Sequence, residues 1–165
     1  WRSALPHATP TDKTLENGDF VVMDFGALYN GYHADMTRTV VIGSPNEKHK
    51  EIYDIVLKSQ LSGIEVARAG VTGAEVDNAC RSIIDNAGYK EYFNHSTGHG
   101  IGLEVHTLPR LSSINTSPLL ENYVVTIEPG IYLPNWGGVR IEDDCWIKSN
   151  KCVPMNRSSK ELISL

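Results

Sequence analysis

The dipeptide Asn30-Gly31 is the feature that most constrains the fold of this chain. It lies between two runs, Phe20–Leu28 and Tyr32–Ile42, that are rich in apolar and β-branched residues. Both central residues of a tight two-residue hairpin turn need positive φ, and Asn-Gly supplies them at low cost. The sequence therefore predicts an antiparallel hairpin whose two strands pair around this turn.

The register of this hairpin decides where its acidic residues lie. With a two-residue turn, Asp35 lies opposite Gly26, and Asp24 points to the same face two positions further along. Such diagonal neighbours are roughly 7–8 Å apart at the backbone, so both carboxylates can reach one small object. Burying two like charges on one face is costly without a cation.

Further strands are expected in the second half of the chain. Leu103 and Val105 alternate as in a short strand, and Asn122–Gly130 is a strand candidate that is broken by Pro129. The chain turns again through Pro134–Gly138, and Val139–Lys148 returns as a last strand. A second hairpin is therefore predicted near the C-terminus.

This second hairpin repeats the acidic arrangement of the first. Glu128 and Glu142 have the same strand parity, and so does Arg140, which can neutralise or orient a neighbouring group. His99 and His106 add imidazole nitrogens within a glycine-rich stretch. Because the loop has an odd length, this pairing is less strongly determined than the first.

Two helices are predicted between the hairpins. Ser44-Pro45-Asn46-Glu47 combines a capping box with proline at the first helical position, which predicts a helix to about Ala69, stopped by Gly70. Thr72-Gly73-Ala74-Glu75 repeats the capping-box pattern, and Gly88 is a plausible C-terminal cap. The expected class is therefore α+β, with two strand pairs separated by two helices.

Carboxylates in mirrored pairs beside histidine indicate a metal site. Oxygen-rich ligands with one imidazole suit Mn²⁺, Co²⁺, Fe²⁺ or Zn²⁺, and bridging carboxylates suit two ions about 3.5–4 Å apart. Each acidic residue taken alone is better explained as a solvent-facing strand position. Four of them in mirrored pairs favour the metal-site interpretation.

Composition limits the other functions open to the chain. The net charge is −5 without a Lys/Arg-rich block, which argues against nucleic acid as a partner, and no apolar run is long enough for a membrane span. Cys80, Cys145 and Cys152 form no C-x-x-C pair and are expected to be buried, unreactive thiols of a cytoplasmic protein. The 165 residues allow one domain with a sizeable core.

An ordered set of motifs resembles the Xaa-Pro peptidases, aminopeptidase P and prolidase, within the methionine-aminopeptidase superfamily. The motifs follow the family order over nearly the whole chain; they are Asp24-Phe25-Gly26, Ala34-Asp35-Met36-Thr37-Arg38-Thr39, Gly98-His99-Gly100-Ile101-Gly102, Val105-His106, Ile127-Glu128-Pro129-Gly130 and Val139-Arg140-Ile141-Glu142-Asp143-Asp144. The resemblance implies a pita-bread fold, a curved antiparallel sheet flanked by helices. It also implies hydrolysis of the peptide bond before proline, with a proline-containing peptide or dipeptide as substrate.

By motif position, the resemblance implies a dinuclear centre with five protein ligands. Asp24 would bind one ion, Asp35 and Glu142 would bridge both, and His99 and Glu128 would complete the other. The two ions would be divalent, with Mn²⁺ expected first and Co²⁺, Zn²⁺ or Fe²⁺ as alternatives.

The resemblance also implies catalytic roles around that centre. Glu128 would handle the proton of the attacking water, and His106 would hydrogen-bond the substrate carbonyl or the tetrahedral intermediate. His7 and His95 would line the substrate side of the site, and Arg140 would steady the ligands or the substrate. Imidazoles beside a developing oxyanion stabilise charge that exists only in the transition state.

Two histidines and the start of the chain depart from the family pattern. His33 and His49 match no motif and are expected at the surface. The family's peptidase domain normally begins with further helices and a strand before His7, so residues 1–165 are expected to be a single metallopeptidase catalytic domain that lacks its N-terminal portion.

Alternatives to the Xaa-Pro reaction stay open at the level of sequence. They are methionine-aminopeptidase specificity, a non-catalytic binding module on the same scaffold, and an inactive fragment. The Asp35-x-Thr-Arg-Thr and Arg140-Ile141-Glu142-Asp143-Asp144 strings favour the proline group. Dipeptides and longer peptides are not separated as substrates, and a homo-oligomer is a family expectation only.

Overall fold

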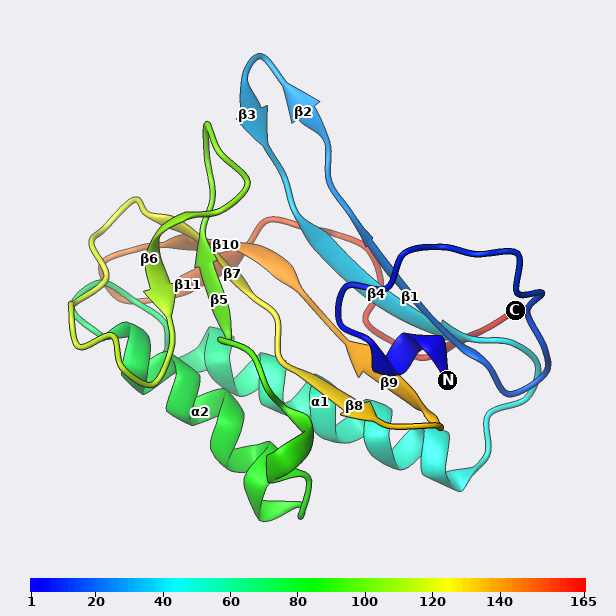
Figure 1. Ribbon diagram of the computed structural model, residues 1–165. Helices are drawn as coiled ribbons and strands as arrows, with labels where there is room; N and C mark the ends of the chain where they lie inside the picture. Colours follow the sequence, from blue (N-terminus) through cyan, green and yellow to red (C-terminus); the bar gives the residue numbers. More distant parts are fainter.

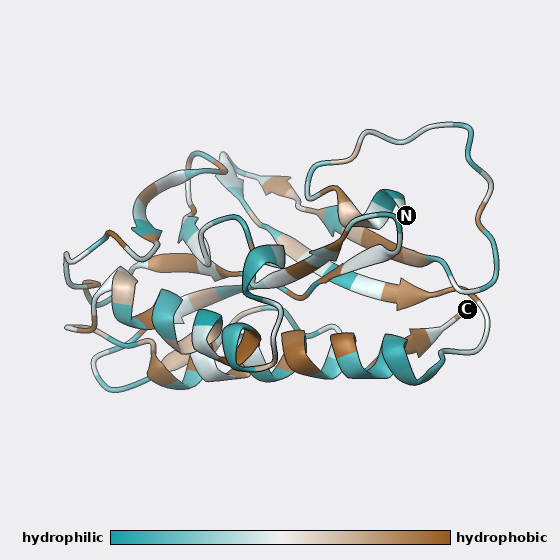
Figure 2. Cartoon of the chain, turned by 60° about the horizontal axis from the view of Figure 1, so that its bottom comes forward, coloured by the Kyte–Doolittle hydropathy of each residue, from teal (hydrophilic) through white to brown (hydrophobic).

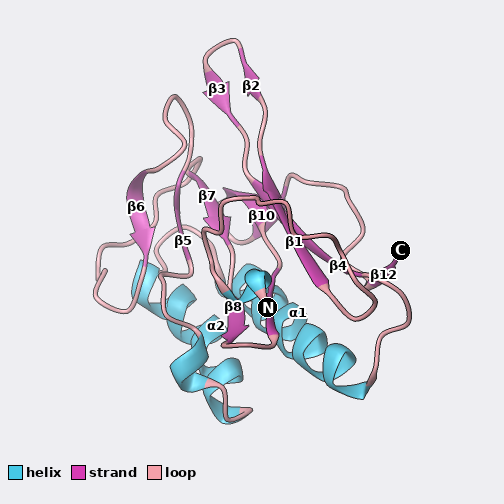
Figure 3. Ribbon diagram, turned by 45° about the vertical axis from the view of Figure 1, so that its right-hand side comes forward, coloured by secondary structure: helices cyan, strands magenta, loops and turns pink.

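Two antiparallel helices support a set of twisted strands in the computed structural model, which describes all residues 1–165 (Figure 1). The helices are α1, Glu47–Val66, and α2, Gly73–Asn86, and two short 3-10 helices are η1, Arg2–Ala4, and η2, Lys90–Tyr92. Figure 3 shows both helices together on one side and the strands on the other. The α+β class and the order of two strand pairs separated by two helices are confirmed.

The first hairpin forms as the Asn-Gly turn predicts. Asn30 has φ of 49° and Gly31 has φ of 84°, and Asp24 pairs with Thr37 in the register that this two-residue turn sets. The hairpin is interrupted between Phe25 and Leu28, and its tip projects from the body of the molecule in Figure 1. Its segments are β1, Phe20–Phe25; β2, Leu28–Tyr29; β3, Tyr32–His33; and β4, Met36–Val41.

The second hairpin is also interrupted, and its register is continuous across the gap. Gly130 pairs with Arg140 on one side and Ile127 with Asp143 on the other, so Glu128 and Glu142 occupy the gap. Pro129 lacks a backbone N–H, and this loss of a donor agrees with the break there. The segments are β7, Val124–Ile127; β8, Gly130–Leu133; β9, Gly137–Arg140; and β10, Asp143–Ile147.

Four further strands complete the sheets. The strand expected at Leu103–Val105 is wrong, because these residues form bends between β5, Gly98–Gly100, and β6, Thr107–Leu111. The sequence prediction also missed β11, Cys152–Pro154, and β12, Ile163–Ser164. Together the larger sheets have the strand orders β1-β4-β12 and β11-β10-β7-β5-β6.

The start of the first helix differs from its prediction. Asn46 is the N-cap of α1 and His49 completes a reciprocal capping box, so the helix begins two residues after the predicted first helical residue, Pro45. Its last residue is Val66 rather than Ala69. The capping box of α2 forms as predicted between Thr72 and Glu75, and Gly88 has φ of 88° just beyond the helix.

Two buried clusters join the helices to the strands. One contains Phe20, Ile52 and Ile131, and the other contains Val76 and Ile127. Figure 2 shows hydrophobic positions on both helices and on the strands that cover them. Since side chains alternate along β7, residues that share the parity of Ile127 face the helices, and Thr126 and Glu128 face away from them.

The helices give no indication of a bilayer segment. Neither α1 nor α2 has the length and apolar character needed to cross a membrane.

Candidate metal centre

The five predicted metal ligands come together where the two hairpins meet. Three overlapping sets of side chains have potential ligand atoms within 4.8 Å of one another. These sets are Asp24, Asp35 and Glu142; His99, Glu128 and Glu142; and Asp35, His99 and His106. Asp35 and Glu142, the two predicted bridging ligands, each belong to two sets, as does His99.

The interruptions in the hairpins place three of these five residues. Asp35 lies in the gap of the first hairpin, and Glu128 and Glu142 lie opposite each other in the gap of the second. A side chain at such a gap is free from the regular pleat and can point towards a shared centre. The mirrored acidic pairs read from the sequence therefore correspond to one site.

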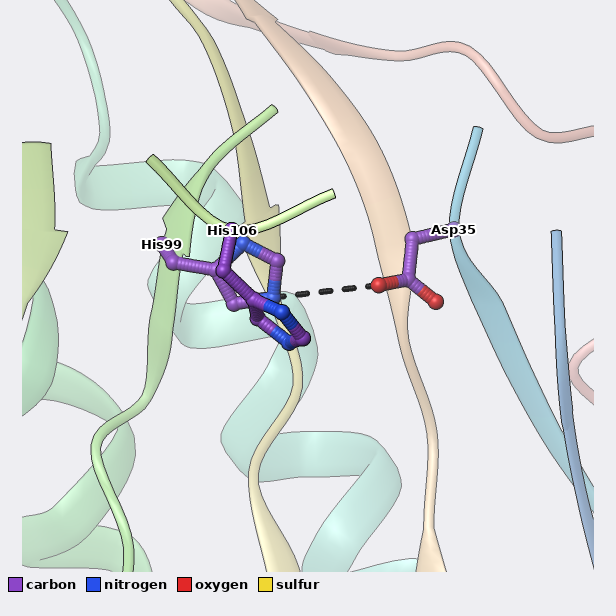
Figure 4. A group of neighbouring side chains, drawn as sticks. All are labelled: Asp35, His99 and His106. Carbon is purple, nitrogen blue, oxygen red and sulfur yellow. Dashed lines mark ion pairs between the residues drawn. The ribbon is translucent and has the colours of Figure 1, made fainter. Parts of the chain in front are cut away.

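The hydrogen bonds of His99 leave one ring nitrogen for a ligand. Its Nδ1 lies 3.0 Å from the carbonyl oxygen of Gly100, which accepts the N–H of that nitrogen. Its Nε2 faces the carboxylates, 3.3 Å from Oε1 of Glu128 and 3.7 Å from Oδ2 of Asp35. Figure 4 shows His99 directed towards Asp35, with His106 beside it.

A threonine hydroxyl fixes each of the two glutamates. Thr37 Oγ1 donates to Glu142 Oε2 at 2.6 Å and accepts from Nε of Arg140 at 3.0 Å. Thr126 Oγ1 donates to Glu128 Oε1 at 2.9 Å and accepts from the backbone N–H of His99 at 3.0 Å. Neither threonine was predicted as a functional residue, although Thr37 lies within the quoted Asp35 motif.

Arg140 is buried, and each of its three side-chain nitrogens donates to a protein acceptor. Besides the bond to Thr37, it donates to Asp24 Oδ2 at 2.7 Å, to the Tyr132 hydroxyl at 3.0 Å and to the carbonyl of Pro6 at 3.1 Å. Of its two predicted roles, these contacts favour steadying a ligand over binding substrate.

Burial and mutual repulsion favour the protonated, neutral form of two of the carboxyl groups. Burial, with the nearby charges of Asp24 and Glu128, raises the pKa of Asp35 to about 7. Burial, with the charges of Glu128 and Asp35, raises the pKa of Glu142 well above its ordinary value. A dication among these groups would favour their ionised forms.

Glu128 and His99 are paired differently. Burial alone would raise the pKa of Glu128, but the hydrogen bond and charge of His99, the charge of His95 and the bond from Thr126 together outweigh burial, so the pKa lies below the ordinary value. Burial would lower the pKa of His99, but Glu128 and Gly100 outweigh it and the pKa is raised. The shifts of Glu128 and His99 therefore favour the charged form of each residue, whereas those of Asp35 and Glu142 favour the neutral form.

The donor set fits divalent cations. Oε1 of Glu142 is buried without any hydrogen-bond partner, although an unpaired buried polar oxygen is costly. Glu142 belongs to two of the three overlapping sets, which together contain four carboxylates and two imidazoles. Such oxygen-rich sets match Mn²⁺ and related metals.

A cavity of about 390 Å³ opens beside the ligands. Its lining includes Asp24, Asp35, His7 and His106, together with apolar residues such as Phe25. His7 and His106 are exposed, and the ring of His106 lies 4.4 Å from that of His99, centroid to centroid. His7, predicted on the substrate side, and His106, predicted to bond the substrate carbonyl, are therefore near the acidic cluster and open to a ligand.

His95 lies close to the site but is engaged by the protein. Its Nδ1 is 2.8 Å from the carbonyl oxygen of Ser96, and its Nε2 is 2.9 Å from the Tyr132 hydroxyl. Burial lowers the pKa of His95 and raises that of Tyr132 to about 12. Because both ring nitrogens have protein partners, the geometry favours a supporting role for His95 over direct contact with substrate.

The two histidines expected at the surface lie elsewhere. His49 is buried, stacks on Trp136 with ring centroids 5.3 Å apart, and caps α1, so its prediction is wrong. His33 is half-buried and lines the 390 Å³ cavity beside Asp35. Its parity with Asp35 in the hairpin was a signal that could have indicated this position.

Twisted, mainly antiparallel strands are backed by two helices, and four carboxylates and an imidazole gather on the side away from the helices. This arrangement defines a pita-bread fold with a candidate metal site. The comparison with protein families agrees, because the model of metallopeptidase family M24 matches residues 1–149. The chain belongs to this family.

Similar proteins are known both as sequences and as solved structures. The chain is 55% identical over 163 residues to an Xaa-Pro dipeptidase of Pyrococcus horikoshii. This match covers 99% of the chain and 46% of that relative. An X-Pro aminopeptidase structure from Thermotoga maritima matches with a TM-score of 0.97 and 48% identity, covering 99% of this chain and 47% of that one. The prolidase from Pyrococcus furiosus matches with a TM-score of 0.94 and 52% identity, covering 96% and 47%. The chain spans about half the length of these relatives.

Proposed function

We propose that the protein containing this chain is a dinuclear metallopeptidase that hydrolyses the peptide bond before proline, with residues 1–165 as the metal-bearing part of its catalytic domain. The observation that carries the proposal is the convergence of Asp24, Asp35, His99, Glu128 and Glu142 from two separate hairpins and β5. The names of the relatives support the proline-directed reaction over methionine-aminopeptidase specificity. The retention of all five ligands argues against a non-catalytic binding module.

The ligands divide into roles that their positions support. Asp24 would hold one ion, His99 and Glu128 would hold the second, and Asp35 and Glu142 would be shared between them. Two bound divalent cations would polarise the scissile carbonyl and lower the pKa of a water molecule between them. Mn²⁺ is the first expectation for the metal, with Co²⁺, Zn²⁺ and Fe²⁺ as alternatives.

Glu128 is the residue we assign to proton transfer. Its carboxylate is oriented by the Thr126 hydroxyl, and its lowered pKa keeps it ionised and able to accept a proton at neutral pH. It can take the proton of the attacking water and return it to the departing proline nitrogen.

His106 and His7 are assigned to the substrate. His106 lies beside His99 at the edge of the cavity, where its ring can donate to the carbonyl oxygen as negative charge develops. Burial and the neighbouring His99 lower the pKa of His106, which favours a neutral imidazole with one N–H to donate. His7, which lines the same cavity, can orient the peptide.

Peptide hydrolysis by the full-length protein tests the proposal. After loading with Mn²⁺, the protein is assayed against Xaa-Pro dipeptides, longer Xaa-Pro peptides and Met-Ala peptides. We expect cleavage before proline and little cleavage of Met-Ala, and the two proline substrates separate dipeptidase from aminopeptidase activity. Preferential release of methionine, or no hydrolysis by metal-loaded protein, would contradict the proposal.

The variant Glu128→Gln tests the assigned proton transfer. It keeps the shape of the side chain but removes the carboxylate that accepts a proton, so we expect kcat to fall by about 10²-fold or more. The unfolding temperature should change little. Turnover at the wild-type rate would remove Glu128 from this role.

A further inference from the structure

An ion pair on α2 holds the segment that leads into the metal centre. Arg81 and Asp77 form two parallel hydrogen bonds, Nε to Oδ2 at 2.8 Å and Nη2 to Oδ1 at 2.9 Å. The Asp77 side chain is 1% exposed and that of Arg81 is 26% exposed. Neither residue belongs to the predicted site.

Both members of the pair also form hydrogen bonds with residues 93–97. Arg81 donates to the carbonyl of Phe93 at 2.9 Å and to that of His95 at 2.8 Å, and its guanidinium lies 4.1 Å from the centroid of the Phe93 ring. Asp77 Oδ1 accepts from the backbone N–H of Thr97 at 3.2 Å and from its hydroxyl at 2.9 Å. Three residues of this segment are therefore tied to one helix face.

The same segment connects directly to two proposed ligands. The carbonyl of Thr97 accepts the backbone N–H of Glu128 at 2.8 Å. His99 follows two residues later in β5, and Gly98 lies so close to the carbonyl of Thr126 that no side chain would fit there. A displacement of residues 95–97 would consequently move Glu128 and His99 together.

We infer that Asp77 and Arg81 are positioning residues of the metal centre, which set the placement of His99 and Glu128 through the segment 93–97. The inference rests on the metal centre of the proposed function and adds residues to it that contact neither metal nor substrate. Supports of this kind beyond the ligands commonly change metal affinity or activity by 10–100-fold when mutated.

The geometry requires arginine rather than any cation. A planar guanidinium can donate two parallel hydrogen bonds to a carboxylate and further bonds to two carbonyl oxygens. An ammonium group has only three donors, and they are not held in a fixed planar arrangement. The hydrogen bonds to Asp77 raise the pKa of Arg81 above its ordinary value, in agreement with a permanent ion pair. Lysine at this position keeps the charge but cannot reproduce the contacts.

Metal titration of the full-length protein tests the inference. Mn²⁺ affinity is measured by calorimetry for wild type, Arg81→Lys and Asp77→Asn, together with kcat and KM on an Xaa-Pro substrate. We expect the Mn²⁺ dissociation constant to rise tenfold or more and kcat to fall tenfold or more, with KM within threefold of wild type. Thr97→Val, which removes one bond to Asp77, gives a milder variant if Asp77→Asn does not fold.

Two controls separate positioning from general stability. Lys50→Met breaks the exposed ion pair with Glu47 on α1, which is 2.8 Å long, and should leave Mn²⁺ affinity unchanged. Ile52→Ala removes a fully buried core side chain on α1, so it should lower the unfolding temperature without changing Mn²⁺ affinity of the folded protein.

The outcomes distinguish this inference from the proposed reaction. Wild-type Mn²⁺ affinity in folded Arg81→Lys and Asp77→Asn would overturn the inference, and so would an equal loss of affinity in Ile52→Ala. Because metal binding needs no substrate, a failure of wild type to cleave Xaa-Pro peptides would count against the proposed reaction alone. A wild-type protein that binds no metal would overturn both.

Discussion

At the scale of residues, the two glutamates depend on two threonine hydroxyls. Thr37 connects Glu142 to Arg140, and Thr126 connects Glu128 to the backbone of His99. Each hydroxyl accepts a hydrogen bond from a fixed N–H and donates its single proton to a carboxylate. The accepted bond fixes the orientation of the hydroxyl and therefore of the bond that it donates. The glutamates are therefore oriented before a metal binds.

Thr37→Val tests this orientation. Valine has nearly the same shape but no hydroxyl, so Glu142 loses a hydrogen bond and Arg140 loses an acceptor. We expect metal affinity to fall by about 10-fold or more, as measured by calorimetry. Thr37→Ser, which keeps the hydroxyl, should restore most of the affinity, and equal affinities for Val, Ser and wild type would argue against the role.

At the scale of elements, the hairpin interruptions place Asp35, Glu128 and Glu142, and Gly26 makes the first interruption possible. A Cβ at Gly26 would collide with the carbonyl oxygen of Ala34, next to Asp35. The strands are therefore closer at this position than any other residue would allow. Gly31 is different, because it needs its positive φ of 84° but has space around it.

Substitution of these two glycines separates ligand placement from fold stability. Gly26→Ala should push Asp35 away from Asp24 and greatly reduce Mn²⁺ binding. Gly31→Ala strains only the turn and should cost about 1–2 kcal/mol of unfolding free energy while metal affinity is kept. Calorimetry and denaturant unfolding measure the two quantities. Retention of full Mn²⁺ affinity in Gly26→Ala would refute this account of the gap.

The start of α1 predicts a pH dependence. The backbone N–H of Asn46 donates to Nδ1 of His49 at 3.1 Å, so the cap requires an unprotonated nitrogen. Burial, followed by the charge of Lys48, lowers the pKa of His49 below its ordinary value of 6.5. The folded protein thus binds fewer protons here than the unfolded chain, and stability present above pH 6.5 is lost as the pH falls.

His49→Gln isolates this dependence. Glutamine can complete a capping box without titrating. We expect wild type to lose about 1 kcal/mol relative to the variant between pH 7.5 and pH 5.5, consistent with the loss of a helix cap. Urea unfolding at both pH values measures the difference. A constant difference across this range would show that His49 does not titrate in the cap.

Much of this arrangement could be predicted from local sequence, and the reasons for the failures are physical. The Asn30-Gly31 turn sets its register through backbone conformation alone, so the placement of Asp24 and Asp35 followed from it. The cap at Asn46 was misplaced because His49 completes it, and histidine is not the usual partner in a capping box. The Asp77–Arg81 contacts join α2 to residues 93–97, and no local pattern encodes that proximity.

At the scale of the whole molecule, the two helices pack against both hairpins and so fix the position of one hairpin relative to the other. The buried clusters join α1 and α2 to the strands, while the carboxylates gather on the side away from the helices. The hairpins are consequently packed on one side and electrostatically repelled on the other. Metal binding should therefore stabilise the entire fold rather than one loop.

Removal of metal tests this coupling. The unfolding temperature of Mn²⁺-loaded protein should fall after treatment with a chelator and recover when Mn²⁺ is restored. A single site at a free metal concentration of 100 times its Kd contributes about 2.7 kcal/mol. Calorimetric unfolding with and without chelator measures the difference, and identical unfolding temperatures would contradict the coupling.

The central claim is that the two hairpins and β5 hold two metal ions at one point. Anomalous diffraction at the manganese edge from crystals grown with Mn²⁺ tests it most directly. We predict two peaks about 3.5–4 Å apart, bounded by Asp24, Asp35, His99, Glu128 and Glu142. Data from fully loaded crystals with no peak among these side chains, or with peaks only elsewhere on the protein, would contradict the claim.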